Sequence, residues 1–296
     1  MRKYPFLQVD AFTTRALQGN ACAVVLDADD LDDETMQTIA REMNLSETAF
    51  VRRSQVADFG VRYFTPSEEI PLAGHPTIAT TFALVHTGRL QLEGSHTVIR
   101  LELRVGPISV DIFAERGNVK NIVMTQQKPT FLKTYDAGEV LPAFGLTKED
   151  ALPGLPIQTV STGTPQLMVP VRDHEALQRA QVDVAAYKRL RATADFFSPH
   201  LFCLGGVTSA GQTFARHFGV PPDVQEDPAT GSATGGMAAY LWRYRLLDLP
   251  MFVAEQGHWM KRPSYMSVEV VGTRNDIETV KVGGSAVAVL QGEMIL

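Results

Sequence analysis

The sequence predicts two similar domains that each mix strands with helices. Arg62–Phe64 reads as the end of a strand, which passes through an acidic, proline-containing turn and enters a helix at Gly74. Arg216–Phe218 begins the same order of elements, and this second copy enters a helix at Gly231. Because the turns differ in length, the order of elements is a firmer match than any pairing of residues. We interpret the repeat as an ancient duplication.

A second internal match supports the duplication. Gly19-Asn20 leads into an apolar strand, and Gly163-Thr164 does the same in the other half of the chain. The 296 residues are long enough for two domains with a core each. A hydrophobic content of 45% with 20% charged residues is that of an ordinary globular protein rather than a disordered chain.

Charge and apolar runs exclude several classes of partner. The net charge is -6, and basic residues occur only in short runs such as Lys261-Arg262, so we expect no nucleic-acid partner. Neither a signal sequence nor an apolar run of membrane-spanning length is present, which predicts a cytoplasmic protein without membrane contact. Cys22 and Cys203 lie in apolar runs, and we expect both to be buried free thiols.

In the first half, apolar periodicity gives most elements. A helix is expected from Asp32 to Asn44, because acidic residues enrich its first turn and an apolar face follows at helical spacing. The residues after Gly74 predict a second helix. Strands are predicted over Phe6–Phe12, Cys22–Leu26, Ala49–Val51, Asp58–Phe64, Val98–Leu103, Ile108–Phe113 and Val119–Met124.

The apolar period is lost over Gln126–Pro129, where we place the crossover between a domain of residues 1–126 and one of residues 127–284. The strand-like run Ala286–Ile295 is expected to return to the first domain, which residues 285–296 would complete. In the second domain, strands are predicted over Ile157–Val160, Gln166–Val171, Leu201–Leu204, Thr213–Phe218, Met251–Ala254, Tyr265–Val271 and Glu278–Val282. Helices are predicted over Glu139–Phe144, Thr147–Ala151, His174–Ala180, Val184–Arg191 and Ser232–Tyr244.

The stretch Glu226–Ala233 is the strongest chemical signal in the chain. Pro228 biases Asp227 away from helical backbone, and a helix of small residues follows. A turn that opens directly into a helix leaves backbone N–H groups unpaired, and such a terminus attracts an anion. The carboxylate of Asp227 can cap that helix or take part in chemistry, and the residue pattern leaves both readings open.

Two further residues have side chains suited to acid–base chemistry. Glu47 stands between two hydroxyl side chains before a strand, a setting that can raise a carboxyl pKa and suit it to acid–base work, although an exposed or capping glutamate would look the same. His75, between Gly74 and Pro76, is suited either to substrate contact or to a structural hydrogen bond. Ser232 does not lie in a nucleophile elbow. No dinucleotide or Walker motif and no metal-ligand spacing is present, so we expect no cofactor and no metal.

Several motifs together resemble the phenazine-biosynthesis PhzF family. They are Gly19-Asn20, Met43–Thr48, Phe64–Pro66, Pro71–Thr77, Glu226–Ala233, Gln256-Gly257 and Arg262–Ser264. The matches occur in order and cover essentially the whole chain. The resemblance implies the α+β fold of diaminopimelate epimerase, with two pseudo-symmetric domains that each curl a sheet around a central helix. It also implies an active site between the domains and a homodimer.

The resemblance also assigns roles to residues. By it, Glu47, His75 and Asp227 are the expected catalytic residues: Glu47 shuttles a proton between substrate carbons, and the other two hold and polarise the substrate. Ser46, Gly74, Gly231 and Ser232 are the expected substrate-binding residues. The physical requirements agree, because one carboxyl group can act first as base and then as acid while helix amino ends stabilise negative charge.

The leading hypothesis is therefore a cofactor-independent isomerase of a small carboxylated, cyclic substrate. A racemase with two facing thiols is disfavoured, because Leu72–Thr77 and Asp227–Ala233 contain no cysteine. Two alternatives remain open from sequence: a family member that binds a metabolite or partner without turnover, and a structural dimer with a vestigial site.

Overall fold

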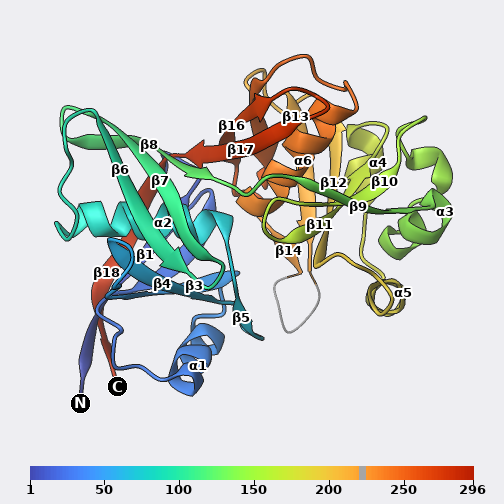
Figure 1. The fold of residues 1–296 in the computed structure, drawn as a ribbon. Helices are drawn as coiled ribbons and strands as arrows, with labels where there is room; N and C mark the ends of the chain where they lie inside the picture. Colours follow the sequence, from blue (N-terminus) through green and yellow to red (C-terminus); the bar gives the residue numbers. More distant parts are fainter. Residues whose placement is uncertain (220–224) are drawn as a thin grey trace.

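The molecule has two halves, each built around one central helix (Figure 1). The computed structural model describes residues 1–219 and 225–296. The helix α2 (Gly74–His86) belongs to the first half, and α6 (Gly231–Arg243) belongs to the second. Both begin where the sequence predicted a helix after a glycine.

The first half contains all eight strands that precede residue 126. They are β1 (Lys3–Ala11), β2 (Asn20–Val25), β3 (Glu47–Arg52), β4 (Phe59–Phe64), β5 (Glu69–Ile70), β6 (His96–Leu103), β7 (Gly106–Glu115) and β8 (Asn118–Thr125). The helix α1 (Asp33–Met43) packs outside β3 and β4. It is N-capped by Asp32, which accepts a hydrogen bond from the amide of Thr35, and it ends at Asn44 in left-handed backbone, as predicted.

The second half repeats this series. Its strands are β9 (Thr130–Tyr135), β10 (Ile157–Ser161), β11 (Pro165–Pro170), β12 (Ser198–Leu204), β13 (Thr213–Phe218), β14 (Glu226–Asp227), β15 (Met251–Gln256), β16 (Ser264–Gly272) and β17 (Ile277–Gly284). Its further helices are α3 (Ala137–Val140), α4 (His174–Arg179) and α5 (Val184–Arg191), with the 3₁₀ turns η1 (Leu141–Phe144), η2 (Lys148–Asp150) and η3 (His258–Met260). The last strand of the chain is β18 (Ala286–Ile295).

The strand pairings of the two halves agree one by one. In the first half β1–β2 is antiparallel, β2–β3 parallel, β3–β4 antiparallel and β4–β6 parallel, followed by the antiparallel pairs β6–β7 and β7–β8. In the second half β10–β11, β11–β12, β12–β13, β13–β15, β15–β16 and β16–β17 repeat that series. The expected pseudo-symmetric α+β fold is confirmed.

Matching side-chain contacts accompany the matching pairings. Arg62 makes two 2.8 Å hydrogen bonds to the carboxylate of Glu69, and Arg216 makes two of the same length to Glu226. Each guanidinium also lies over the phenylalanine two residues later in its strand. From the glutamate onward, both copies reach the first residue of their helix after the same number of residues, so the difference in length lies in the preceding turn.

Each central helix is buried on nearly all sides because strands surround it. The helix α2 packs against β1, β2 and β8, and α6 packs against β10, β11, β16 and β17. Ile78 and Leu84 on α2 and Met237 on α6 are fully buried. A helix that is apolar all round requires such an enclosure, and small residues such as Ala233 allow strands to approach closely. Both cysteines are buried and free, as predicted.

Two strands join the halves. Antiparallel pairing of β8 with β17 connects the two sheets into one hydrogen-bonded network. The final strand, β18, runs back to the first half and pairs along the whole of β1, from Lys3 opposite Ile295 to Ala11 opposite Ala286. In Figure 1 the two chain ends lie beside each other.

Three short or exposed strands were not predicted. The strand β9 has four exposed residues of six, so its sequence lacks the apolar alternation that marks a half-buried strand. The strands β5 and β14 have two residues each and lie in the acidic turns that precede the central helices. The sequence predicts those segments as turns alone.

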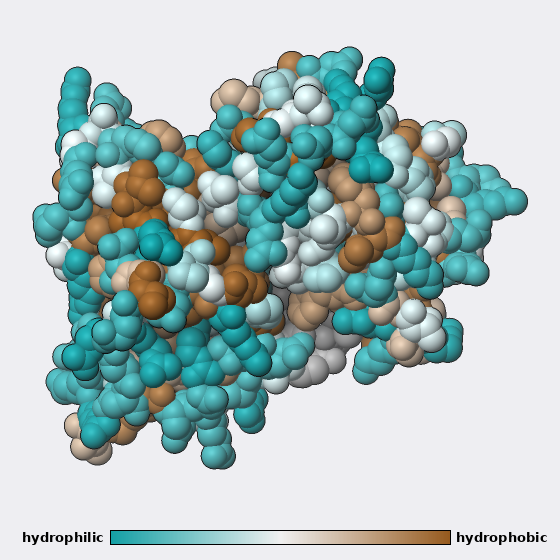
Figure 2. Space-filling view, viewed as in Figure 1, coloured by the Kyte–Doolittle hydropathy of each residue, from teal (hydrophilic) through white to brown (hydrophobic). Residues whose placement is uncertain are grey.

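Two large hydrophobic side chains are exposed on the sheet of the first half. In the space-filling view, hydrophobic residues gather over the region where β6 and β7 run (Figure 2). Val98 on β6 and Phe113 on β7 are 53% and 41% exposed, and the ring of His96 stacks on Phe113. Exposed apolar groups of this size on a sheet are typical of contact surfaces.

Within the described residues, no helix combines the length and apolar character needed to span a bilayer.

The amino ends of α2 and α6 meet at two glycines. A Cβ atom added at Gly74 would lie 2.7 Å from the Cα atom of Gly231 and 2.8 Å from the amide nitrogen of Ser232. These obstacles are backbone atoms, which cannot turn aside as a flexible side chain can. The two helices touch because neither has a side chain at this position.

Replacing Gly74 by alanine is therefore expected to force the helix ends apart and to lower the free energy of unfolding by about 1–3 kcal/mol, the usual cost of overpacking. Urea denaturation of the Gly74→Ala variant measures this loss. Gly292→Ala is the matched control, because the added methyl group meets nothing within 4 Å there. Equal stability of both variants would contradict the close contact.

Candidate active site

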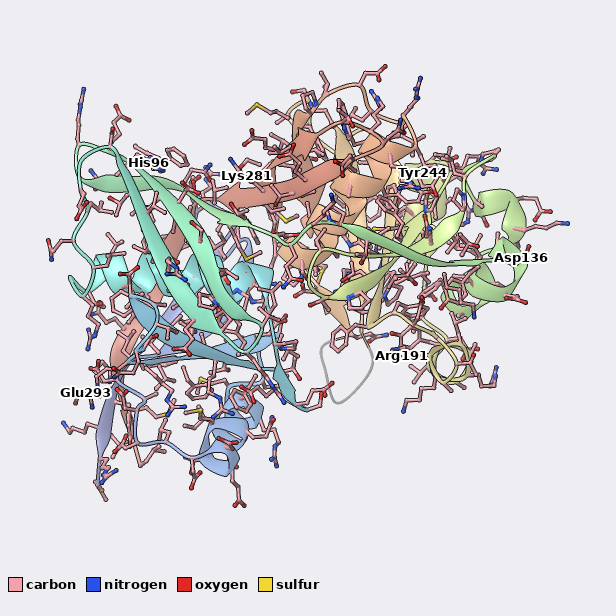
Figure 3. All side chains as sticks on the ribbon, in the orientation of Figure 1. His96, Asp136, Arg191, Tyr244, Lys281 and Glu293 are labelled. Carbon is pink, nitrogen blue, oxygen red and sulfur yellow. The ribbon has the colours of Figure 1, made fainter. Side chains whose placement is uncertain are left out.

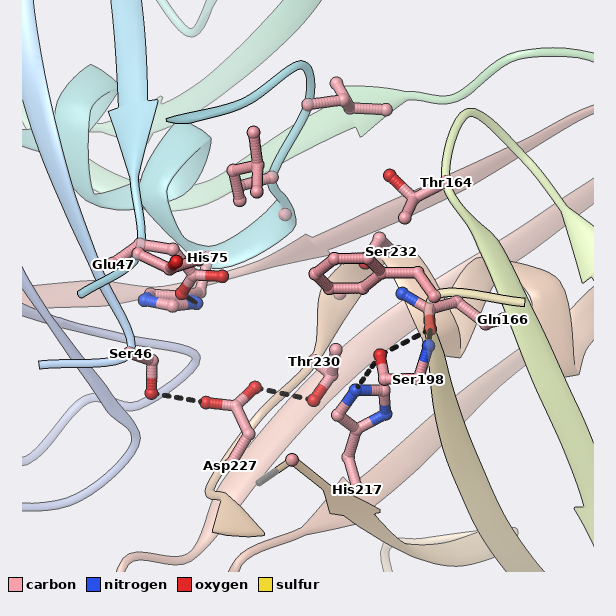
Figure 4. A pocket seen from close by; sticks show the side chains of 18 of the residues that line it. Ser46, Glu47, His75, Thr164, Gln166, Ser198, His217, Asp227, Thr230 and Ser232 are labelled. Carbon is pink, nitrogen blue, oxygen red and sulfur yellow. Dashed lines mark hydrogen bonds and ion pairs between the residues drawn. The ribbon is translucent and has the colours of Figure 1, made fainter. Parts of the chain in front are cut away.

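A cavity of about 400 Å³ lies between the two halves, at the meeting point of the central helices. This volume is within the range of small-molecule sites, ~300–1,000 Å³. All seven residues proposed from the sequence line it: Ser46, Glu47, Gly74, His75, Asp227, Gly231 and Ser232. Figure 4 shows Glu47 and His75 on one side of this space, with Asp227 and Thr230 of the second half between them and His217.

Glu47 is held at the amino end of β3. It pairs with Cys22 of β2 in the parallel ladder, which fixes its backbone at the rim of the sheet. Its side chain is 18% exposed, and one carboxylate oxygen lies 3.3 Å from Nδ1 of His75. Burial, and to a smaller extent the charge of Glu47, raises the pKa of the Cys22 thiol well above its usual value. The thiol beneath Glu47 is therefore neutral.

His75 is the second residue of α2 and is almost completely buried. Burial lowers its pKa from 6.5 to about 3, so the ring is neutral near pH 7. A neutral imidazole beside Glu47 can donate or accept one hydrogen bond without adding charge to the site.

Asp227 forms a link between the halves. One of its oxygens accepts hydrogen bonds from the hydroxyl of Ser46 at 2.7 Å and the amide of Asn20 at 2.7 Å, and the other accepts from the hydroxyl of Thr230 at 2.6 Å. Burial raises the pKa of this carboxyl group, and the three hydrogen bonds act in the opposite direction. Asp227 does not cap α6: the residue at the cap position is Thr230, and its side chain makes no capping bond.

Asn20 is the polar residue that sequence reasoning missed. Its side-chain nitrogen lies 2.7 Å from Asp227, 2.8 Å from the carbonyl oxygen of Ala229 and 3.0 Å from Nδ1 of His75. It thereby ties the residues before α6 to the first turn of α2. The repeat of Gly19-Asn20 and Gly163-Thr164 marks this position in the sequence, but the sequence assigns the Asn20 side chain no role.

Gln256 at the end of β15 and Arg262 just before β16 fix the loops of the site. The amide of Gln256 donates to the carbonyl oxygen of Asp227 at 2.6 Å and accepts from the amide of Thr230 at 3.1 Å. The guanidinium of Arg262 binds the carbonyl oxygen of Gly19 and the carboxylate of Asp10, both at 2.8 Å. These contacts give a physical reason for the Gln256-Gly257 and Arg262–Ser264 motifs, which lie outside the cavity lining.

The amino ends of both central helices open to the cavity. Neither α2 nor α6 has a side chain capping its N-terminus, and Gly74, His75, Gly231 and Ser232 all line the cavity. Uncapped amides and two converging helix dipoles favour a bound anion. Among the described residues, no group of three or more histidine, cysteine or acidic side chains is arranged to hold a metal ion.

The family model described as phenazine biosynthesis-like protein, PhzC-PhzF, matches residues 9–292. The chain belongs to this family. Trans-2,3-dihydro-3-hydroxyanthranilate isomerase from Pseudomonas aeruginosa is 34% identical over 294 residues, covering 98% of this chain and 99% of that protein. A crystal structure of a PhzF-family phenazine biosynthesis protein from Bacillus anthracis matches with a TM-score of 0.88 and 30% identity, covering all of both chains.

The fold extends beyond the PhzC-PhzF family. A hydroxyproline epimerase from Agrobacterium vitis matches with a TM-score of 0.68 over all of this chain and 93% of its own, at 14% identity. An identity this low shows the shared fold alone. The expected epimerase-like fold and membership in an isomerase family are thus confirmed, whereas the roles of individual site residues remain predictions.

Burial of His75 predicts a pH dependence of stability. The pKa of His75 is about 3 in the folded protein, below its ordinary value of 6.5. Between these two pH values, the imidazole binds a proton in the unfolded chain but not in the folded protein. The stabilising contribution is complete above pH 6.5 and is lost as the pH falls towards 3. Below about pH 5.5, the loss approaches 1.4 kcal/mol per pH unit. We expect His75→Gln to flatten the wild-type slope by about this amount.

Urea denaturation of both proteins at intervals from pH 8 to pH 5 measures the difference. The comparison at pH 8, where the imidazole is neutral in both states, isolates the packing cost of the substitution. Parallel curves for wild type and variant between pH 6 and pH 5 would contradict a neutral His75.

Proposed function

We propose that this protein is an isomerase that moves a proton between two carbon atoms of a small carboxylated, cyclic substrate. Glu47 is the group that carries the proton. The observation on which the proposal rests is the position of its carboxylate, at a cavity bordered by the uncapped amino ends of α2 and α6.

The reaction begins with Glu47 as a carboxylate. One oxygen takes a proton from a substrate C–H bond, and the electron pair of that bond moves into the conjugated system of the substrate. The negative charge that develops is stabilised by the backbone amides at Gly74 and Gly231. Glu47, now a carboxylic acid, returns the proton to a different carbon atom. Atoms and electrons balance without a metal or an organic cofactor.

The neighbouring side chains support this step. His75, 3.3 Å from Glu47, orients the carboxyl group and remains uncharged through the cycle. Asp227 and Ser46, joined by a 2.7 Å hydrogen bond, hold polar groups of the substrate between the halves. Ser232, at the first turn of α6, contributes a hydroxyl group to the same wall.

The second half has no counterpart of Glu47. Pairing of β11 with β12 aligns Gln166 with Ser198, in the same way that pairing of β2 with β3 aligns Cys22 with Glu47. The hydroxyl of Ser198 is a far weaker base than a carboxylate, so in our proposal it does not take the proton. The proton is therefore taken up and returned on one face of the substrate, as a single carboxyl group requires.

The relative from Pseudomonas aeruginosa supports the substrate class, since its name specifies isomerisation of a ring that bears a carboxylate. We propose that this chain, which is 34% identical to that relative, catalyses the same type of reaction on a carboxylated ring whose other substituents can differ. We further propose a homodimer in the cytoplasm. Val98 on β6 and Phe113 on β7, which are exposed in the described structure, are the side chains that we assign to the dimer contact.

Replacing Glu47 by glutamine is expected to lower turnover by about 10²–10⁴-fold, because the amide can neither take nor return the proton. In deuterium oxide, the wild-type protein is expected to exchange a carbon-bound hydrogen of its substrate, which nuclear magnetic resonance detects. The trans-2,3-dihydro-3-hydroxyanthranilate named for the relative is the first candidate substrate to test.

Glu68→Gln is the matched control, since Glu68 lines the same cavity from the turn before β5. It is expected to retain exchange close to the wild-type rate. Equal exchange in the Glu47→Gln variant would remove Glu47 from the reaction. Thermal stabilisation by candidate acids, without product from any of them, would favour the alternative of a binding protein.

A further inference from the structure

The wall of the cavity opposite Glu47 is formed by polar side chains of the second half. Gln166 on β11, Ser198 on β12 and His217 on β13 line this wall. In Figure 4 they are connected by dashed lines and lie across the open space from Glu47 and His75. None of the three takes part in the proton transfer described above.

The oxygen of the Gln166 amide faces away from the cavity. It accepts hydrogen bonds from the backbone nitrogen of Ser198 at 3.2 Å and from the Ser198 hydroxyl at 2.7 Å. A backbone N–H can only donate, so the amide atom that faces it must be the oxygen. The orientation of the Gln166 side chain is thereby determined.

This orientation also determines which atoms of Ser198, His217 and His200 donate hydrogen bonds and which accept them. Because the Ser198 hydroxyl donates to Gln166, it must accept from Nε2 of His217 at 2.8 Å. The other ring nitrogen of His217 is then an acceptor, and Nδ1 of His200 donates to it at 3.3 Å. Burial lowers the pKa of His217 to about 3 and that of His200 well below its usual value, so each ring carries a single proton.

With these hydrogen bonds assigned, the amide nitrogen of Gln166 still has two N–H groups that can donate. The side chain belongs to a residue that is only 2% exposed, and it lines the cavity. Among the described residues, no hydrogen bond to this nitrogen is present. Because this nitrogen is accessible at the surface of the cavity, water can accept its hydrogen bonds in the free protein, and an acceptor oxygen of a ligand can take the place of that water.

A positive charge lies on the same wall. Arg191, at the end of α5, lines the cavity, and its Nε donates to the carbonyl oxygen of Phe197 at 3.0 Å. Figure 3 labels Arg191 on the side of the second half that faces the first. A guanidinium group beside an amide donor attracts carbonyl oxygens and, more strongly, carboxylates.

We propose that Gln166 binds the substrate through its amide nitrogen, which donates a hydrogen bond to a second acceptor oxygen on the side away from Glu47. Ser198 is the residue that positions Gln166. The substrate class is then a cyclic acid that carries a carbonyl or carboxylate oxygen in addition to the carboxylate at the helix ends. This inference deepens the proposed function and rests on its assignment of the cavity as the substrate site.

Calorimetric titration with matched aromatic acids tests the proposal. The probes are benzoate, its 3-acetyl and 4-acetyl derivatives, and benzene-1,3- and 1,4-dicarboxylate. We expect at least one derivative to bind the wild-type protein roughly tenfold more tightly than benzoate, as one additional hydrogen bond in the cavity allows. The acetyl probes distinguish a carbonyl oxygen from a carboxylate.

Two substitutions isolate the donor. Gln166→Met retains the length of the side chain without a donor, and the affinity gain over benzoate is expected to disappear. Gln166→Glu retains an oxygen for Ser198 but presents a second oxygen to the cavity, so the derivatives should bind more weakly than benzoate. Circular dichroism and thermal melting establish that each variant is folded. A wild-type protein without any gain, or a gain that survives in Gln166→Met, would overturn the proposal.

Ser198 has its own test as a positioning residue. In Ser198→Ala the affinity for benzoate is expected to stay near the wild-type value while the gain of the derivatives shrinks, and Ser198→Thr should restore it. In the Glu47→Gln variant, the derivatives are expected to keep their full gain in affinity over benzoate, although this variant lacks the proton-transfer activity. Failure of the proton-transfer proposal and failure of this one are therefore distinguished, because only the second abolishes the gain. An unchanged gain in Ser198→Ala would reject its positioning role.

Discussion

The contact between Gly74 and Gly231 is the constraint on which the rest of the site depends. It brings the amino ends of two thirteen-residue helices together, and each end carries about half a positive charge. Two such ends repel one another unless negative charge lies between them. The carboxyl groups of Asp227 and Glu47 border the cavity beside these ends and supply negative charge there.

Duplication explains why the halves share a backbone, and divergence explains why only one of them carries the proposed acid–base group. Equivalent positions in the parallel ladders hold Glu47 in the first half and Ser198 in the second. One side of the cavity has a titratable carboxyl group, and the other has a chain of neutral hydrogen-bonding groups that begins at His200. A pocket built from two copies of one unit has thus become chemically asymmetric, as recognition of an asymmetric molecule requires.

Much of this arrangement could be predicted from the sequence, and the exceptions have physical reasons. The central helices and Asp227 are visible locally, because glycine, proline and helical spacing mark them within a few residues. The contacts of Asn20 with Asp227 and of Ser198 with Gln166 depend on strands that are distant in sequence, so no local pattern indicates them. The strand β9 was missed because its exposed side chains show no period, although it pairs with β10.

Return of β18 to β1 sets an order on the assembly of the protein. During synthesis the first half emerges early, yet one edge of β1 has no partner until residues 286–295 leave the ribosome. An open strand edge is a site of wrong pairing, and the second half must form while that edge waits. The sheet around α2 is therefore completed after the sheet around α6. A chain interrupted before β18 would leave the backbone hydrogen-bonding groups along one edge of β1 unpaired, and its first half would be incomplete.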